Sequence, residues 1–161
     1  MLPRGKRPSA RSFHRSPEGG SIGGWSLYAK DGKLRYCYNL LGIRRFYVDG
    51  DSEIPSGTHQ VRVEFAYDGG GLGKGGHVAL FVDGRKVGEG RVDATAAMVF
   101  SADDTCDVGM EGGALVAEDY PEPNTFFEEV NWVEIALGED AEDADHLISP
   151  DERVQIAIAR Q

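Results

Sequence analysis

The sequence contains few cysteines and no long apolar run. Cysteine occurs twice in 161 residues, at Cys37 and Cys106, without the spacing of a zinc site or the density of a disulfide framework. We predict that both are free, buried thiols. No apolar run approaches the roughly 18 residues that cross a bilayer, and the basic N-terminus is not followed by the apolar run of a secretory signal. We therefore expect a cytoplasmic protein with no membrane partner.

Positive charge is scarce in the body of the chain. The net charge is -10, and the two ends differ in sign. Residues 1–20 carry five basic side chains and one acid, a charge of +4, whereas residues 138–161 carry seven acids and two arginines, a charge of -5. The body between them therefore carries -9. Because phosphate binding needs clustered positive charge, this balance argues against a nucleic-acid partner.

The composition predicts three parts. Residues 1–22 are rich in Arg, Pro and Ser without an apolar period, which predicts a disordered basic segment. Residues 23–137 are predicted to form one globular, turn-rich domain, since the chain is 40% apolar and contains 22 glycines. Residues 138–161 form an acidic tail that ends in the short apolar stretch 154–158, for which both an edge strand and a short helix stay open.

Two Asp-Gly pairs lie between short apolar runs. The run 25–30 meets Asp31-Gly32 and then the run 33–38, and the run 77–82 meets Asp83-Gly84 before a further run begins. Asp-Gly in this setting predicts a type I′ turn, which needs a positive φ at both central residues. We therefore expect two β-hairpins.

The clearest period in the chain is an alternation typical of strands. Residues 59–68 place one apolar set on one face and polar residues on the other, which predicts a half-buried antiparallel strand. The apolar set is Val61, Val63, Phe65 and Tyr67. Further strands are predicted at Met98–Ala102 and Trp132–Leu137, on either side of an irregular segment, Asp103–Pro123. About eight short strands without a helical period predict an all-β, two-sheet antiparallel sandwich.

Several segments resemble, in the same order, the C-terminal accessory domain of large bacterial arylsulfatases. Together they cover roughly residues 23 to 137. They are Gly23-Gly-Trp-Ser-Leu-Tyr-Ala-Lys-Asp-Gly-Lys33, Tyr38-Asn-Leu-Leu-Gly42, Val63-Glu-Phe-Ala-Tyr-Asp-Gly-Gly-Gly-Leu-Gly-Lys-Gly-Gly76, Leu80-Phe-Val-Asp-Gly-Arg-Lys-Val-Gly-Glu-Gly90, Phe100-Ser-Ala-Asp-Asp-Thr and Asp107-Val-Gly109. The resemblance implies a jelly-roll or concanavalin-A-like sandwich attached behind an alkaline-phosphatase-like sulfatase body.

The resemblance does not imply sulfatase activity in this chain. The family's active site is built on Cys/Ser-x-Pro/Ala-x-Arg, whose first residue becomes formylglycine. Cys37 begins Cys-Tyr-Asn-Leu-Leu, Cys106 begins Cys-Asp-Val-Gly-Met, and no serine begins the motif. We therefore expect no catalytic residue and no cofactor.

At the front, residues 1–22 are unrelated to the family, whose domain is preceded by an additional apolar segment and, ahead of that, by the enzyme. We interpret the chain as a gene remnant, or a reading frame that begins inside a frameshifted sulfatase gene. The sandwich would then lack an edge strand and expose ladder groups that invite pairing with another chain.

Three candidate binding sites can be drawn from the sequence, each beside a structural alternative. The glycine-rich segment 68–76 lacks the Ser/Thr and the helix of a P-loop, so we interpret it as a hairpin connection in which glycine supplies positive φ. Asp103, Asp104 and Asp107, with further acids nearby at Glu111, Glu118 and Asp119, are weak candidates for Ca²⁺ ligands, since hard oxygen ligands suit that ion. Acidic loops are more often solvated.

The third candidate is a sugar-stacking platform of aromatic side chains. Aromatics in strands more often form core or cross-strand pairs. The members of the platform are Trp25, Tyr28, Tyr36 and Tyr38, with Phe46, Tyr47 and Trp132. The four histidines are isolated from any nucleophile pattern. The leading hypothesis is thus a non-catalytic accessory sandwich whose partner is a sulfatase body or another copy of itself. The alternative is a stand-alone carbohydrate-binding module that takes a glycan.

Overall fold

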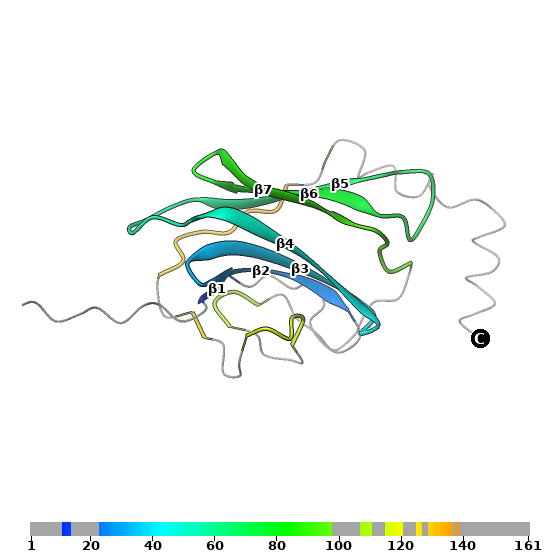
Figure 1. The fold of residues 1–161 in the computed structure, drawn as a ribbon, viewed down its shortest axis with the longest axis horizontal. Helices are drawn as coiled ribbons and strands as arrows, with labels where there is room; N and C mark the ends of the chain where they lie inside the picture. Colours follow the sequence, from blue (N-terminus) through cyan, green and yellow to red (C-terminus); the bar gives the residue numbers. More distant parts are fainter. Residues whose placement is uncertain are drawn as a thin grey trace, which may run out of the picture.

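The chain folds into two β-sheets packed face to face (Figure 1). The computed structural model describes residues 11–13, 23–97, 107–110, 115–120, 125–126, 129–136 and 138. These residues contain seven strands and no helix, and so no apolar helix of membrane-spanning length. The prediction of an all-β, two-sheet antiparallel sandwich is confirmed.

Each sheet is built from strands that follow one another along the chain. The first contains β1 (Arg11–Phe13), β2 (Gly24–Lys30), β3 (Lys33–Leu40) and β4 (Arg44–Glu53), in the order β1-β2-β3-β4. The second contains β5 (Val61–Tyr67), β6 (Gly76–Val82) and β7 (Arg85–Val92), in the order β5-β6-β7. All pairs are antiparallel. β1 belongs to the segment that was predicted to be disordered, so the sheet includes three residues that precede Gly23.

The turns explain why the strands fold back so tightly. Asp31 and Gly32 have φ of 51° and 80°, and Asp83 and Gly84 have φ of 50° and 77°, as the two predicted Asp-Gly turns require. A third tight turn joins β3 to β4 and was not predicted. There Leu41 has φ of 53°, which is uncommon for a side chain of this size.

The third turn is held by its own hydrogen bonds. The N–H of Ile43 donates to the carbonyl of Leu40 at 2.9 Å, and the N–H of Gly42 donates to Oδ1 of the buried Asn39 at 2.9 Å. The Asn39 side chain therefore stabilises this turn, as an Asp-Gly pair stabilises the other two.

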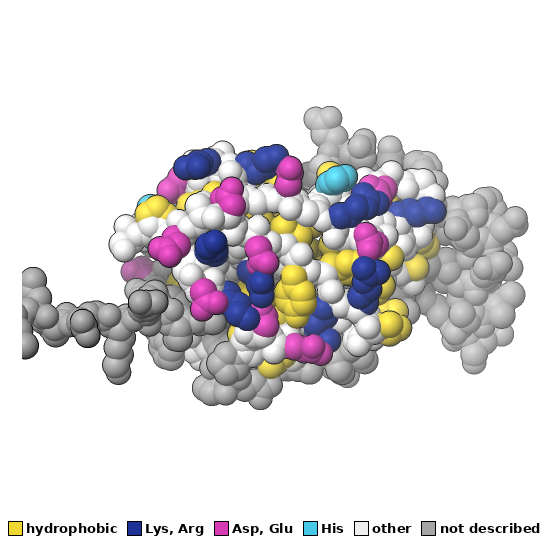
Figure 2. Space-filling view, viewed as in Figure 1, with side chains coloured by type: hydrophobic (Ala, Val, Ile, Leu, Met, Phe, Trp, Pro, Cys, Tyr) yellow, Lys and Arg dark blue, Asp and Glu magenta, His cyan; other side chains and the backbone are white. Residues whose placement is uncertain are grey.

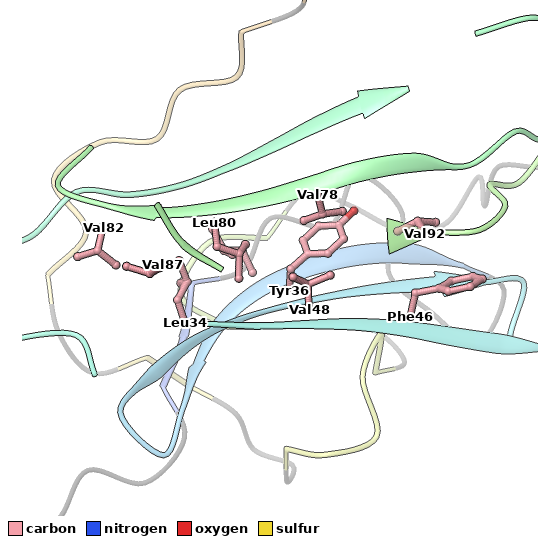
Figure 3. Packing of buried hydrophobic residues seen from close by; sticks show 10 residues of the cluster. Leu34, Tyr36, Phe46, Val48, Val78, Leu80, Val82, Val87 and Val92 are labelled. Atoms are coloured by element: carbon pink, nitrogen blue, oxygen red, sulfur yellow. The ribbon is translucent and has the colours of Figure 1, made fainter. Parts of the chain in front are cut away.

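The core lies between the two sheets, where the inward side chains of both meet (Figure 3). It consists of Leu27, Leu34, Tyr36, Phe46, Val48, Val78, Leu80, Val82, Val87 and Val92. Because strand side chains alternate between faces, every second residue of β2, β3, β4 and β6 enters this layer. Each fully buried Leu or Val contributes roughly 2 kcal/mol through removal of its apolar surface from water.

β5 presents its predicted apolar face to the core, but only its first half is well covered. Val61 and Val63 pack against the core, while Phe65 and Tyr67 remain 40% and 36% exposed. The Phe65 ring lies over Gly76 on the neighbouring strand, where an added Cβ would come within 2.5 Å of its Cζ atom. β5 is an edge strand, so its aromatic side chains are reached by solvent from the side.

The predicted strand at Trp132–Leu137 is not formed by the residues that the structure describes there. Residues 129–136 have no strand pairing, and Trp132, Val133 and Ile135 are 60%, 49% and 45% exposed. An alternating sequence becomes a strand only when another strand completes its ladder, and residues 129–136 form no such ladder. The predicted strand Met98–Ala102 lies outside the described residues. The described parts of the segment Asp103–Pro123 are irregular, as predicted.

The two sheets approach most closely where β7 crosses β4, and glycine makes this approach possible. A Cβ at Gly90 would lie 2.6 Å from Cγ2 of Val48, and a Cβ at Gly88 would collide with the carbonyl oxygen of Asp49. A β-bulge just before this point shifts the register of β6 and β7 and places Val87 in the core. The glycines of β7 thus face the other sheet because the Asp49 backbone and the Val48 side chain fill the space that side chains on β7 would need.

Replacing Gly88 by alanine should destabilise the fold by about 1–3 kcal/mol, the usual cost of overpacking a dense interior. Urea unfolding followed by tryptophan fluorescence measures the change. Gly138→Ala is the matched control, because no atom lies within 4 Å of a Cβ at that position. Equal stability of the two variants would show that the sheets are not in close contact at Gly88.

Candidate functional site

The richest cluster of ionisable groups lies on the outer face of the four-stranded sheet. Residues 115–120, which we call the clasp, cover this face on the side away from the other sheet (Figure 1). Beneath the clasp, Tyr28 and Cys37 are fully buried against Val116, Ala117 and Tyr120. The sandwich therefore has a second, smaller core outside its main one.

Asp119 is the centre of the clasp. Its Oδ1 accepts a hydrogen bond from the Tyr28 hydroxyl at 2.6 Å, and its Oδ2 accepts from Lys30 Nζ at 2.8 Å and from Arg35 Nη1. Lys30 Nζ also donates to the Asp119 carbonyl oxygen at 3.0 Å. Arg35 in turn holds Asp49 through two of its guanidinium nitrogens. Three donors from β2 and β3 thus converge on one carboxylate.

The pKa values of these groups follow from their contacts. Burial alone would raise the pKa of Asp119, but the donors Lys30, Tyr28 and Arg35 outweigh it and hold that pKa below its usual value. Burial and the hydrogen bond to Asp119 raise the pKa of Tyr28 far above its usual range. The hydrogen bond to Asp49 is the main cause of the raised pKa of Arg35. Asp119 therefore stays ionised and Tyr28 stays protonated.

A second set of contacts anchors the clasp to the neighbouring strands. Arg45 donates from Nε to the Val116 carbonyl at 2.7 Å and from Nη1 to Glu118 at 2.6 Å. The Tyr120 ring packs edge-on against Tyr28, with centroids 4.8 Å apart. Polar groups at the ends and an aromatic pair in the middle fix the clasp at several points.

The geometry of the clasp suits attachment better than catalysis. Lys30 and Arg35 are balanced by Asp49 and Asp119, and the hydrogen bonds run between members of the cluster. General acid–base catalysis needs a group that exchanges protons near the working pH. Here the carboxylate is shifted to hold its charge and the buried tyrosine to hold its proton. The cluster binds the clasp to the sheet.

The aromatics of the predicted sugar platform do not share one exposed face: Phe46 is in the main core, while Tyr47 and Trp132 are 38% and 60% exposed. Trp25, Tyr36 and Tyr38 point toward the other sheet, where Trp25 stacks on Tyr36 with centroids 6.2 Å apart. Tyr38 accepts a hydrogen bond from the N–H of Ala96 at 2.8 Å. Tyr28 points the opposite way and is buried under the clasp. Their burial is typical of core aromatics rather than of a stacking surface.

Of the weak calcium candidates, only Asp107 lies among the described residues, where it is half-buried. Asp103 and Asp104 lie outside them. Asp119 and Glu118 belong to the same acidic run, yet they face Lys30, Arg35 and Arg45. In the part of the chain that is described, no group of three or more His, Cys, Asp or Glu side chains is placed to hold a metal ion. The sequence did not reveal that Arg35 and Arg45 pair with these acids, because the basic residues lie more than 70 positions away.

The glycine-rich loop after β5 is organised by one side chain. The Tyr67 hydroxyl donates to the carbonyl of Gly71 at 2.5 Å and accepts from the N–H of Lys74 at 2.9 Å. Several glycines of the loop have positive φ, as the structural interpretation of this segment requires. The Tyr67 hydroxyl thus satisfies two backbone polar groups of the loop.

Comparisons with known proteins add no family to this picture. A scan against protein-family models, a search of curated proteins and a search of solved structures each find no match. The resemblance to an arylsulfatase accessory domain stays a prediction that rests on the sequence segments.

Substituting Asp119 by asparagine should loosen the clasp and lower the free energy of unfolding by about 2 kcal/mol, because three donors lose a charged acceptor. In a Cys106→Ser background, Cys37 is the only thiol, and its alkylation rate reports how often the clasp opens. We expect faster alkylation of Cys37 in Asp119→Asn. Glu118→Gln is the matched control, since its exposed ion pair contributes about 1 kcal/mol or less. Unchanged protection of Cys37 in Asp119→Asn would show that other contacts hold the clasp.

The same carboxylate gives a pH dependence with a defined sign. The pKa of Asp119 is lower in the folded than in the unfolded chain, so its contribution is full above the unfolded value of about 3.9 and is lost as pH falls through the folded value. As pH falls from about 5 to about 2, the wild type should lose more stability than Asp119→Asn. Thermal unfolding of both proteins across this range measures the difference. If the unfolding temperatures of the two proteins fall in parallel with pH, Asp119 does not contribute to the acid sensitivity.

Proposed function

We propose that the chain is a non-catalytic β-sandwich of the arylsulfatase C-terminal type, and that it acts by packing against a sulfatase catalytic body. The observation that carries the proposal is the exposed apolar strip Trp132, Val133 and Ile135, three large apolar side chains within four residues. Single exposed apolar residues are ordinary, whereas three large ones within four residues of sequence are typical of a segment that binds a partner. Tryptophan is also the residue most enriched where interfaces carry their binding energy.

The ionisable groups support a binding role rather than a catalytic one. Lys30, Arg35 and Asp119 hold the clasp. On the outer face of the other sheet, exposed pairs such as Lys86 with Glu89 and Arg91 with Asp68 balance each other. Basic and acidic side chains are interspersed on the face seen in Figure 2. Cys37 does not begin the formylglycine motif, and it lies fully buried beneath Val116. The function then resides in a surface, whose energy comes from burial of apolar area.

A long bacterial arylsulfatase truncated after its catalytic body is the probe that tests this proposal. We expect the purified chain to bind it in isothermal titration calorimetry, and Trp132→Ala to weaken binding at least tenfold through loss of a central anchor. Ile43→Ala is the matched control, because Ile43 is exposed at the far β3–β4 turn and lies outside the strip. The chain alone should not turn over an aryl sulfate. Absence of binding by the wild type, or equal effects of the two variants, would overturn the proposal.

A glycan array with and without Ca²⁺ tests the alternative function. Binding of a glycan by the wild type would favour a stand-alone carbohydrate-binding module. We expect no binding in either condition, because Tyr28 and Tyr36 are buried on opposite faces of the sheet.

A further inference from the structure

The four sheet edges of the sandwich are not equally protected. β1, at one edge of the first sheet, is three residues long, and short edge strands offer little template for pairing. β4 and β7 form two other edges and lie against each other through Val48, Gly88 and Gly90. A register shift also interrupts the pairing of β4 with β3 and that of β7 with β6. β5 forms the fourth edge and has none of these features.

β5 is a regular strand that is bonded to one other described strand, β6. Its seven residues contain no Pro, Gly or Lys, and its register with β6 is unbroken. The N–H of Asp83 donates to the carbonyl of Gln60 at 2.8 Å, and the N–H of Asp68 donates to Gly75 at 3.0 Å, so the even-numbered residues bond to β6. In an antiparallel ladder the groups of the alternate residues then point to the other side. No other described strand pairs with that outer edge.

We propose that β5 pairs with β5 of a second copy of this chain, antiparallel, about a two-fold axis at Val63. This inference does not rest on the proposed sulfatase partner. The axis places Val63 opposite its own symmetry mate, and Arg62 opposite Glu64 of the second copy. Both members of each hydrogen-bonded pair are then odd-numbered residues, whose N–H and C=O groups point outward. A two-fold axis makes the interface isologous, so each contact occurs twice.

The charges select this register among its neighbours. Arg62 and Glu64 lie on the outer face, are about half exposed, and form an ion pair with each other along the strand at 2.5 Å, so each charge stays within reach of a second strand. An axis at Arg62 would place the two arginines opposite each other, and an axis at Glu64 would place the two glutamates opposite each other. Like charges directly opposite destabilise a strand pair, whereas opposite charges stabilise it. Among these three registers, only the axis at Val63 creates two complementary cross-strand ion pairs.

The apolar face of the strand fits the same arrangement. The exposed Phe65 of one copy would lie opposite Val61 of the other, and the two Val63 side chains would meet at the axis. Aromatic and β-branched residues form favourable cross-strand pairs of about 0.2–1 kcal/mol each. The pairing would join the two three-stranded sheets into one six-stranded sheet and extend both apolar layers across the axis. A single strand pair buries modest area, so we expect a dissociation constant on the order of 10 µM.

Two charge reversals test the interface with the full-length chain. Arg62→Glu leaves two acids on the edge and Glu64→Arg leaves two bases, so each variant alone should be monomeric in analytical ultracentrifugation at concentrations where the wild type is a dimer. When the two variants are mixed, every position 62 faces an opposite charge at position 64. We expect the mixture to form a one-to-one heterodimer with affinity near that of the wild type.

The control is an exposed ion pair elsewhere on the same sheet. Lys86→Glu and Glu89→Lys reverse the pair on β7 and should dimerise as the wild type does. Circular dichroism confirms that each variant is folded, which matters because Arg62 also packs over the Phe81 ring. A monomeric wild type, dimers that survive either reversal, or a mixture that stays monomeric would each overturn the proposal. These outcomes are independent of whether the chain binds a sulfatase body.

Discussion

The close approach of β4 and β7 is the constraint on which the sandwich depends. The backbone at Asp49 and the side chain of Val48 occupy the space that side chains at Gly88 and Gly90 of the other sheet would need. With the sheets brought this near, Val48 and Val87 both lie in the core and the inner layer closes at this side. Larger residues on β7 would separate the sheets and open the layer to water, because dense interiors do not absorb extra volume. The bulge in β7 serves the same end, since it turns Val87 inward beside the glycines.

The four-stranded sheet is buried on both faces, and the two faces use different forces. Its inner face is apolar and contributes through burial. Its outer face carries Lys30, Arg35 and Tyr28, which would be costly to cover unless their hydrogen bonds were satisfied. Asp119 satisfies all three at once and lets an irregular segment cover the sheet. The polar contacts here fix where the clasp lies on the sheet, while apolar burial supplies the stability of the fold.

The surfaces that remain available explain the two proposals. The charged outer face of the second sheet is solvated and internally paired, whereas the strip at Trp132 and the β5 edge each leave something incomplete. The strip leaves apolar side chains in water, and the edge leaves backbone ladder groups without a described partner strand. The first is suited to a large apolar partner surface, and the second to another strand. Both describe a protein that works through contacts rather than through chemistry.

The sequence by itself determined β2, β3, β5, β6 and β7 and the two Asp-Gly turns, whereas β4 was not predicted and β1 lies in a segment predicted to be disordered. Period-two alternation and Asp-Gly pairs are local properties, which backbone sterics convert directly into hairpins, so β5 and the turns at Asp31 and Asp83 were predictable. The turn at Leu41 was not, because Leu-Gly has little local preference and the Asn39 side chain stabilises it from within the fold.

Only the tertiary structure decided what those strands face and what covers them. The pairing of Asp119 with Lys30 and Arg35 joins residues more than 80 positions apart, and no spacing in the sequence encodes it. The same holds for the burial of Tyr28 under the clasp and for the exposure of Phe65 at an edge. An alternating sequence specifies two faces of a strand, but it cannot specify which neighbour each face meets. For the same reason residues 132–136 alternate like a strand and yet form no ladder among the described residues.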